Sequence, residues 1–382
     1  MEEVKKPRIA IIHPWLPQYR VEFFTLLSEK LDKQGVELKI YFGSPESDWA
    51  KRNDQSNLPG STMLRTKQLR LFGRVLLSKR ISGVDWSQFD LIVVEQAVRN
   101  LETYKLLAKQ ETLAFWGHGK TYTQKQGLLL EKLKVKLTLK GQWFFVYTQG
   151  GKVALVNNGF QSRKISVLNN TFDAKKLRLQ LESLSTEEVA TFRKLHNLKL
   201  GSTGIFIGAL DAVKRLDLLF EAVDFVHSRN PDFRLIIAGA GPLLEAIQRE
   251  TEIRPWVTYF EPAFGRDKAL LLAASDIICI PGRVGLVTID SFAARKPIVT
   301  SPDPFHPPEI EYLVNGRNAI ISENLTPESY GLAILKSLER GTYLNLVEGC
   351  GISHENYTLD SMVESFVDGV TRCLEEIGPK RL

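Results

Sequence analysis

Three short segments place charged or ionisable side chains next to glycines or at the start of a helical run. In chain order they are "FWGHGK" (115–120), "DAVKRLDLLF" (211–220) and "PGRVGLVTID" (281–290). His118 stands between two glycines, Lys214 and Arg215 open an amphipathic run, and Asp290 is the single acid behind a glycine-rich turn. Cations and the N-terminus of a helix both attract anions, so the second and third segments are candidates for phosphate binding.

The turn at 282–285 has a backbone suited to a negatively charged ligand. It opens a predicted helix, and the first N–H groups of a helix have no partner inside that helix. We therefore expect the N–H groups of Gly285, Leu286 and Val287 to face phosphate. Glycine at position 285 lets the ligand approach the backbone closely.

The elements that position these residues follow from an alternation of short β-branched or aromatic runs with longer amphipathic runs. Parallel strands need helical crossovers, so this alternation predicts βαβ units and parallel sheets. Strands are expected at 8–12, 37–43, 90–96, 112–119, 143–150, 164–170, 204–210, 233–242, 257–262, 276–282, 297–301 and 318–322. The clearest helices are expected at 21–33, 99–109, 215–229 and 360–378.

Two further segments decide the domain plan. Residues 131–140 alternate lysine with apolar side chains like a strand, but Leu129, Leu133 and Leu137 also form a helical stripe, and the alternating architecture favours the helix. Residues 172–201 are polar and helical, after which the alternation starts again. The sequence thus predicts an α/β protein of two doubly wound domains. Ligands in such sheets bind at the carboxyl ends of the strands, and the cleft between two domains is the expected site.

The composition is that of an ordinary globular protein. Of 382 residues, 43% are hydrophobic and 25% are charged, and the length favours two domains. Three scattered cysteines without a CxxC pair argue against a disulfide framework or a zinc site and fit a reducing compartment. The first residues do not resemble a signal peptide, and no apolar run reaches the roughly 20 residues that cross a bilayer. These features favour a cytoplasmic location.

Positive charge is concentrated in the N-terminal half. Residues 62–82 hold six basic residues and no acid, and residues 120–140 hold six lysines and one glutamate. A solvated basic face, an anionic inner-leaflet membrane surface and an anionic substrate all fit these runs. Nucleic acid does not, because base-reading motifs are absent and few aromatic residues accompany the charges.

The "AGAGP" turn (238–242) has the spacing of a dinucleotide-binding turn, but on its own this signal is weak. It lies in the middle of the chain, and the first strand is followed by "HPWLPQYR", which has no glycine. This arrangement argues against an NAD enzyme.

Taken together, the segments resemble the retaining glycosyltransferases of family 4, which have the GT-B fold of two Rossmann-like domains facing a central cleft. The resemblance covers nearly the whole chain and is strongest in the C-terminal half. It rests on five segments there and on the histidine loop at 115–120. The five are "FIGALDAVKRLDLLFEAV" (206–223), "LIIAGAGP" (235–242), "VTYFEPAFGRDKALLLAASDIICIPG" (257–282), "VGLVTIDSFAARKPIVTS" (284–301) and "HPPEIEYLVNGRNAIIS" (306–322).

The resemblance implies domain roles. Residues 1–171 correspond to an acceptor-side domain, and residues 172–359 to a nucleotide-sugar donor domain. The last helix, about 360–382, is expected to pack back on the first domain.

The resemblance also implies roles for the chemistry-bearing residues. His118 falls where the family has a histidine near the donor sugar, and Asp290 where it has a ribose-binding glutamate. Lys214 falls on the diphosphate-binding lysine, and Arg215 follows it and could share that role. Gly285, Leu286 and Val287 would offer backbone N–H groups to the diphosphate. A carboxylate suits ribose because it can accept hydrogen bonds from two hydroxyls.

The chain departs from the family pattern at three places. The first glutamate of the usual acidic pair falls on Gly282, and the usual diphosphate arginine falls on Ala209. The N-terminal glycine-rich loop is replaced by "LPQYR", which offers Tyr19 and Arg20. We expect Arg20, Arg215 or Arg283 to replace the lost arginine. Contacts to the sugar or acceptor are expected from Tyr19, Arg20, Gly282 and Arg283.

The implied activity is retaining transfer of a hexosyl group, without metal or cofactor, from a UDP- or GDP-sugar to a glycan or lipid-linked acceptor in cell-surface polysaccharide synthesis. The acceptor would attack the face that the leaving group departs from, with the β-phosphate as base. The missing acid leaves a second hypothesis open, an inactive GT-B subunit that binds or activates a partner transferase. A sugar-nucleotide epimerase or another GT-B enzyme is a third.

Overall fold

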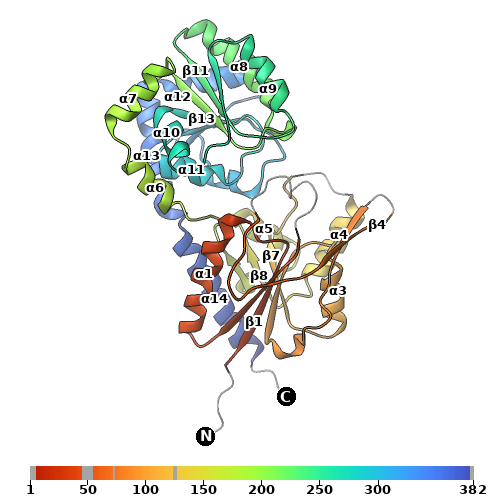
Figure 1. Ribbon diagram of the computed structural model, residues 1–382. Coiled ribbons are helices and arrows are strands. Elements are labelled where there is room, and N and C mark those ends of the chain that lie inside the picture. Colours follow the sequence, from red (N-terminus) through yellow and green to blue (C-terminus); the bar gives the residue numbers. More distant parts are fainter. Residues whose placement is uncertain (1–5, 45–54, 72–73, 124–126, 379–382) are drawn as a thin grey trace. The chain divides into compact units, whose positions relative to one another are not determined.

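The computed structural model describes residues 6–44, 55–71, 74–123 and 127–378, and parts of both predicted basic runs (72–73 and 124–126) lie outside these ranges (Figure 1). The chain forms two compact units. Unit 1 comprises Met1–Asp173 with Leu359–Leu382, and unit 2 comprises Ala174–Thr358. Within the described residues, no helix is both long enough and apolar enough to span a membrane.

Unit 1 is built on a parallel sheet with the strand order β3-β2-β1-β6-β7-β8-β9. Its strands are β1 (Arg8–His13), β2 (Glu37–Phe42), β3 (Thr62–Met63), β6 (Leu91–Glu95), β7 (Leu113–Gly117), β8 (Trp143–Val146) and β9 (Ile165–Val167). The central strands are buried along nearly their whole length, as expected of parallel strands that helices cover on both faces.

Helices cover both faces of this sheet. Helices α1 (Gln18–Lys33) and α14 (Leu359–Ile377) lie side by side on one face (Figure 1). There, the Phe366 ring of α14 stacks on the Phe145 ring of β8 with 4.0 Å between centroids. The other face is covered by α3 (Leu101–Ala108), α4 (Leu128–Thr138) and α5 (Gln149–Asn157). The C-terminal helix thus completes the core of unit 1.

A hairpin of two antiparallel strands, β4 (Thr66–Leu71) and β5 (Arg74–Lys79), stands apart from the main sheet. The pattern of apolar and polar residues predicts no element here. The hairpin is fixed to α3 by an ion pair of 2.7 Å between Lys79 and Glu102, whose side chains are only 1% and 2% exposed. Leaving either charge buried without the other would be costly, so the pair holds the hairpin in one place.

Unit 2 repeats the architecture with a sheet in the order β12-β11-β10-β13-β14-β15. Its strands are β10 (Thr203–Ile207), β11 (Arg234–Ala238), β12 (Val257–Phe260), β13 (Ile277–Cys279), β14 (Ile298–Thr300) and β15 (Ala319–Ile321). Its helices are α6 (Lys175–Glu182), α7 (Thr186–Leu195), α8 (Leu216–Arg229), α9 (Leu244–Glu252), α10 (Gly265–Ala274), α11 (Val287–Ala294), α12 (Pro327–Leu338) and α13 (Arg340–Asn356).

The predicted fold class, two doubly wound α/β units with parallel sheets, is confirmed. The ambiguous segment at 131–140 is helical over most of its length, as part of α4. The predicted strand at 143–150 is too long, because β8 ends at Val146 and the Thr148 hydroxyl caps α5 by accepting from the N–H of Gly151.

Candidate functional site

The glycine-rich turn of unit 2 joins β13 to α11 and is tied to the loop before α8. The N–H of Gly282 donates to the carbonyl of Lys214 (3.1 Å), and the N–H of Arg283 donates to that of Val213 (3.0 Å). In return, the Lys214 ammonium donates to the carbonyl of Arg283 (2.5 Å). The structure thus brings Lys214 and the 282–287 turn together, as a site for one diphosphate requires.

The backbone contact explains why position 282 carries no acid. A Cβ on Gly282 would lie 2.5 Å from the carbonyl carbon and 2.7 Å from the Cα of Lys214, and closer still to the carbonyl oxygen of Val213. All three obstacles are backbone atoms, which cannot swing away. Backbone atoms of Val213 and Lys214 fill the space that a glutamate side chain would need at position 282. Gly282 itself is buried. The expected contact of Gly282 with a sugar or acceptor is therefore wrong.

A buried histidine fixes the same turn from the other side. The N–H of Val284 donates to Nδ1 of His306 (3.1 Å), while Nε2 of His306 lies 2.8 Å from the carbonyl oxygen of Ser301. These two partners require the neutral ring with its proton on Nε2. Burial lowers the pKa of His306, which favours that neutral form. His306 thus has a structural role in shaping the turn.

The N–H groups at the start of α11 are available to a ligand. The N–H groups of Gly285, Leu286 and Val287 have no hydrogen-bond acceptor among the described residues. All three residues are only half-buried, and a Cβ on Gly285 would meet nothing nearer than Pro307 Cγ at 3.8 Å. A helix N-terminus with free donors and an adjacent ammonium is the arrangement that binds phosphate.

Asp290 lies in the first turn of α11, as predicted, and is 7% exposed. Its Oδ1 accepts from the ammonium of Lys268, a residue of α10, at 2.6 Å. The sequence gives no sign of this partner. The ion pair holds the carboxylate in one orientation and leaves Oδ2 as the oxygen with most capacity for a further hydrogen bond.

Arg215 begins α8 in a left-handed backbone conformation, with φ of 56°. Its Nε lies 3.6 Å from the carboxylate of Asp217 on the same helix. The side chain is partly exposed, so this weak contact leaves it able to reach an anion.

The two glycines of the "AGAGP" turn have a packing role. The N–H of Leu210 donates to the carbonyl of Ala240 (2.9 Å), which draws the loop after β10 against this turn. A Cβ on Gly241 would lie 2.8 Å from the backbone N of Leu210, and one on Gly239 would overlap the carbonyl of Gly208. Close backbone approach explains these glycines without a bound nucleotide.

In unit 1, His118 follows β7 in a tightly constrained loop. Gly119 has φ of +77°, and a Cβ there would lie 2.6 Å from the carbonyl oxygen of Gly151 in α5. The N–H of Gly119 donates to Oε1 of Gln96 (3.2 Å), and the Gln96 amide donates to Thr138 of α4 (2.8 Å). Gln96, which sequence reasoning missed, therefore fixes the loop that presents His118.

The His118 ring lies 5.0 Å from the ring of Tyr147 and 6.0 Å from that of Tyr122, between centroids. Burial, with a smaller contribution from the ammonium of Lys134, lowers the pKa of His118 to about 4. The imidazole is therefore neutral at pH 7 and can both donate and accept a hydrogen bond.

We expect His118 to stay neutral down to about pH 5. Its pKa in the folded chain lies below the ordinary value of 6.5, so the unfolded chain binds the proton first. The contribution of His118 to stability is thus complete above pH 6.5 and is lost as the pH falls towards 4. NMR titration of its Cε1–H, assigned by comparison with His118→Gln, measures this. A midpoint near 6.5 would contradict the assignment.

The two candidates of the "LPQYR" segment differ. Tyr19 is 40% exposed and its ring is accessible to a ligand, whereas Arg20 is 1% exposed. The Arg20 guanidinium donates to the Asn170 side chain and lies 5.4 Å from the centroid of the Trp116 ring. Arg20 is part of the core of unit 1. The expectation that it contacts a sugar or replaces the diphosphate arginine is wrong.

The predicted residues thus fall into two groups, one in each unit. Unit 2 brings together Lys214, Arg215, Arg283, the turn at 285–287 and Asp290, while unit 1 carries His118 and Tyr19. Within the described residues, no cluster of three or more His, Cys, Asp or Glu side chains is placed to hold a metal ion.

Comparison with known proteins agrees with this division of the chain. Residues 201–340, within unit 2, match the family described as Glycosyl transferases group 1. No curated protein matches the chain.

Solved structures resemble the chain over nearly its full length. Anabaena HepE in complex with UDP has 11% identity and a TM-score of 0.69, covering 96% of this chain and 100% of that chain. WaaG, a glycosyltransferase involved in lipopolysaccharide biosynthesis, has 13% identity and a TM-score of 0.61, covering 95% and 99%. The N-terminal domain of Candida albicans trehalose-6-phosphate phosphatase has 12% identity and a TM-score of 0.68, covering 98% of each.

Identities this low establish the fold alone, and a fold hosts more than one activity. The chain has the GT-B fold, and its residues 201–340 form a domain of the type described as Glycosyl transferases group 1.

Proposed function

We propose that the protein is a retaining glycosyltransferase. It would move a hexosyl group from a UDP- or GDP-sugar to a glycan or lipid-linked acceptor in cell-surface polysaccharide synthesis. The observation that carries this proposal is the turn at 282–287, which has free N–H groups and is bonded at three points to the loop of Lys214. The solved complexes of HepE with UDP and UDP-glucose support a nucleotide-sugar donor.

Each residue group has a distinct task in this proposal. Cleavage of the glycosyl bond leaves negative charge on the β-phosphate. The Lys214 ammonium and the N–H groups of 285–287 would stabilise that charge without a metal, because they are already oriented before the bond breaks. Arg215 and Arg283 are the further cations that could neutralise the diphosphate. The Oδ2 of Asp290 would accept from the ribose hydroxyls.

The N-terminal unit would supply His118 for the sugar and Tyr19 for the sugar or acceptor. A neutral imidazole offers one donor and one acceptor, which suits the hydroxyl groups of a hexose. The fixed loop around Gly119 holds the ring in one place, and fixed groups contribute more to catalysis than mobile ones.

Turnover tests the proposal directly. The full-length protein is incubated with UDP- and GDP-hexoses and a mixture of glycan and lipid-linked acceptors, in the presence of a metal chelator. We expect transfer with the anomeric configuration of the donor retained, and its loss in His118→Ala. A product of inverted configuration would sink the retaining mechanism, and an absolute need for metal would sink the metal-independent chemistry.

A second candidate function is a GT-B subunit that binds a nucleotide but activates a partner transferase. The specific observation in its favour is the backbone packed beside Gly282, which rules out the acid that the family places there. This subunit would bind nucleoside diphosphate yet show neither transfer nor donor hydrolysis. Sugar transfer that disappears in His118→Ala would eliminate this second candidate. If the sugar nucleotide is instead converted to its epimer, the protein would be a sugar-nucleotide epimerase.

We further propose a cytoplasmic location with peripheral contact to an anionic membrane surface. The cysteines are unpaired and buried, in keeping with a reducing compartment. Helix α4 exposes Leu128 (81%) and Leu129 (84%), with Lys132 and Lys136 also at the surface. Exposed leucines beside lysines are typical of surfaces that lie on anionic lipid.

We expect Leu129→Ser/Leu133→Ser to reduce retention by vesicles of phosphatidylglycerol and phosphatidylcholine about tenfold at low salt, because apolar burial in the interface is lost. Co-sedimentation measures this. Leu195→Ser, at an exposed leucine of unit 2, is the matched control and should be retained like the wild type. If the wild type itself is not retained at low salt, the membrane proposal fails.

A further inference from the structure

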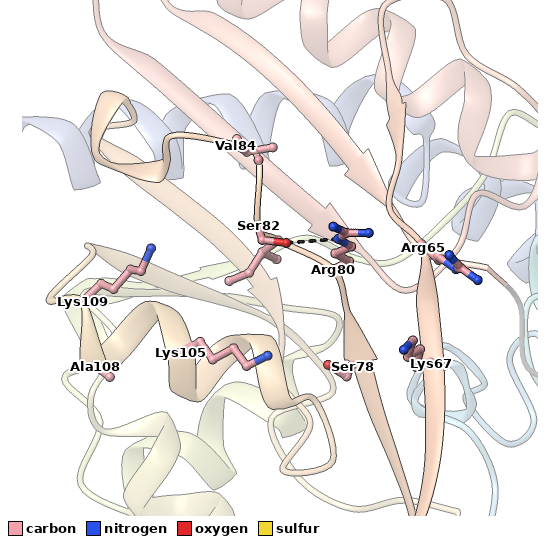
Figure 2. A pocket seen from close by; sticks show the side chains of 11 residues that line it. Arg65, Lys67, Ser78, Arg80, Ser82, Val84, Lys105, Ala108 and Lys109 are labelled. Carbon is pink, nitrogen blue, oxygen red and sulfur yellow. Dashed lines mark hydrogen bonds between the residues drawn. The ribbon is translucent and has the colours of Figure 1, made fainter.

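Unit 1 contains a basic pocket of about 790 Å³ that none of the assignments above uses (Figure 2). Its cations are Arg65, Lys67, Arg80, Lys105 and Lys109, and its hydroxyl groups are those of Ser78 and Ser82. Among the described residues that line it, none is acidic. The pocket therefore combines five positive charges with hydroxyl donors in one concave surface.

The pocket is assembled from segments far apart in sequence. Figure 2 shows Lys105 on α3 and Lys109 directly after that helix, while Lys67 lies on β4, on the other side, and Arg65 directly precedes β4. The segment after β5 contributes Arg80, whose Nε donates to the Ser82 hydroxyl (3.2 Å). The hairpin, the segment after β5 and the end of α3 thus line the same pocket.

The framework around the pocket is rigid. The buried pair of Lys79 and Glu102 locks the hairpin to α3, and the indole N–H of Trp86 donates to the carbonyl of Ile81 (2.8 Å). The N–H of Arg80 donates to the carbonyl of Arg65 (2.9 Å), which joins the two strands at the mouth of the hairpin. The cations therefore extend from a preorganised surface.

The positive charges of the five lining cations are not neutralised by carboxylates of the described residues. Among the described residues, none of them forms an ion pair with a carboxylate, in contrast to the neighbouring Lys79. A concave surface lined by one sign of charge concentrates the field and raises the local concentration of counter-ions. Such a surface favours a multiply charged anion over a monovalent one.

The lining of the pocket is distinct from the loop of His118. Residues 82–84 precede β6 and Lys109 precedes β7, whereas the hairpin wall joins the sheet at the carboxyl end of β2, where the N–H of Ser44 donates to the Thr66 hydroxyl (3.0 Å). His118 follows the carboxyl end of β7. Among the described residues that line the pocket, none belongs to the loop at 117–120.

We propose that this pocket binds a ligand with at least two phosphate groups. Phosphate oxygens accept hydrogen bonds from lysine, arginine and serine, all of which line the site. A volume of about 790 Å³ is far larger than one phosphate and admits a sugar bisphosphate or a phospholipid headgroup that carries two phosphates. Its apolar wall, formed by Ile81, Val84 and Ala108, would contact the carbon skeleton between the phosphates.

The test compares soluble and membrane-bound phosphate on the full-length protein. Fructose 1,6-bisphosphate is titrated by calorimetry, and vesicles of phosphatidylcholine with or without cardiolipin, whose headgroup carries two phosphates, are used in co-sedimentation. The pocket variants are Lys105→Ala/Lys109→Ala and, separately, Arg80→Ala. Lys176→Ala/Lys194→Ala, at exposed lysines of unit 2, removes the same charge as the double variant and serves as the control. Thermal melting checks that every variant folds.

We expect the wild type and the charge-matched control to bind the bisphosphate or the cardiolipin vesicles, and each pocket variant to bind about tenfold more weakly or worse. Loss of bisphosphate binding identifies a soluble ligand, and loss of vesicle binding alone identifies a headgroup. Binding must persist in Lys214→Ala, and UDP binding must persist in the pocket variants, so that this result is independent of the donor site. If folded pocket variants bind both probes like the wild type, or the wild type binds neither, the proposal is overturned.

Discussion

Replacing Lys214 with alanine is expected to lower sugar transfer on the order of a hundredfold to a thousandfold, the usual effect of removing one donor from a site of developing negative charge. The Lys214 ammonium already donates to the carbonyl of Arg283 at 2.5 Å, so it is held beside the turn before any ligand binds. An ammonium has three N–H donors, so Lys214 can also donate to a phosphate oxygen. Initial rates at saturating donor, together with the Michaelis constant for the donor, measure the effect.

The neighbouring residue provides the control for Lys214. Arg215→Ala removes the same charge from a partly exposed side chain that contacts Asp217. We expect a much smaller loss of transfer in this variant, because Arg215 makes no bond to the turn. Equal losses in the two variants would mean that bulk charge, and not the bonded position of Lys214, determines donor use.

The substitution Gly282→Glu, which places at this position the glutamate of the family that the sequence resembles, is expected to damage the site. The new Cβ would lie 2.5 Å from the carbonyl carbon of Lys214, and overpacking of this kind costs about 1–3 kcal/mol of folding free energy or more. The turn and the Lys214 loop must separate, which breaks the bonds between them. Urea denaturation measures the stability, and calorimetry with UDP measures the loss of binding.

Gly285→Ala is the matched control for this prediction. The Cβ it adds has only Pro307 Cγ within 4 Å, at 3.8 Å, so stability should change by no more than about 0.5 kcal/mol. A Gly282→Glu variant that folds normally and transfers sugar faster would contradict our explanation of the missing acid. It would show instead that position 282 still has room for a catalytic carboxylate.

The parallel architecture could be predicted from sequence because its strands are buried on both faces. Such strands are short apolar runs, and the helices between them carry a clear amphipathic pattern. The β4–β5 hairpin lacks that signal. Lys67, Gln68, Leu69 and Arg70 of β4 are all exposed, so no alternation of buried and exposed side chains marks the strand. Its position depends on the distant pair of Lys79 and Glu102.

The candidate site shows the same limit. The turn at 282–287 and the position of Lys214 could be predicted, because a glycine-rich turn before a helix has a local sequence pattern. Their mutual hydrogen bonds could not, since the two bonded residues Lys214 and Arg283 are 69 positions apart in the chain. For the same reason, the partners of Asp290 and Val284, which are Lys268 and His306, left no recognisable trace.

Arg20 illustrates the opposite error. A tyrosine–arginine pair after the first strand suggests a ligand contact, but burial is a tertiary property that one sequence does not reveal. In the folded unit, the guanidinium is surrounded by the rings of Tyr19, Phe23, Trp116 and Tyr147. The cation is thus used for packing within unit 1.

The most direct test of the account is the titration of the wild-type protein with UDP, GDP and ADP by calorimetry, with a metal chelator present. We predict that at least one of these nucleoside diphosphates binds at one site per chain. The same titration of Lys214→Ala, with an unchanged melting temperature, should show binding at least tenfold weaker. Absence of binding to the wild type at millimolar nucleotide, or equal binding to the two proteins, would contradict the assignment of the 282–287 turn and Lys214 as a diphosphate site.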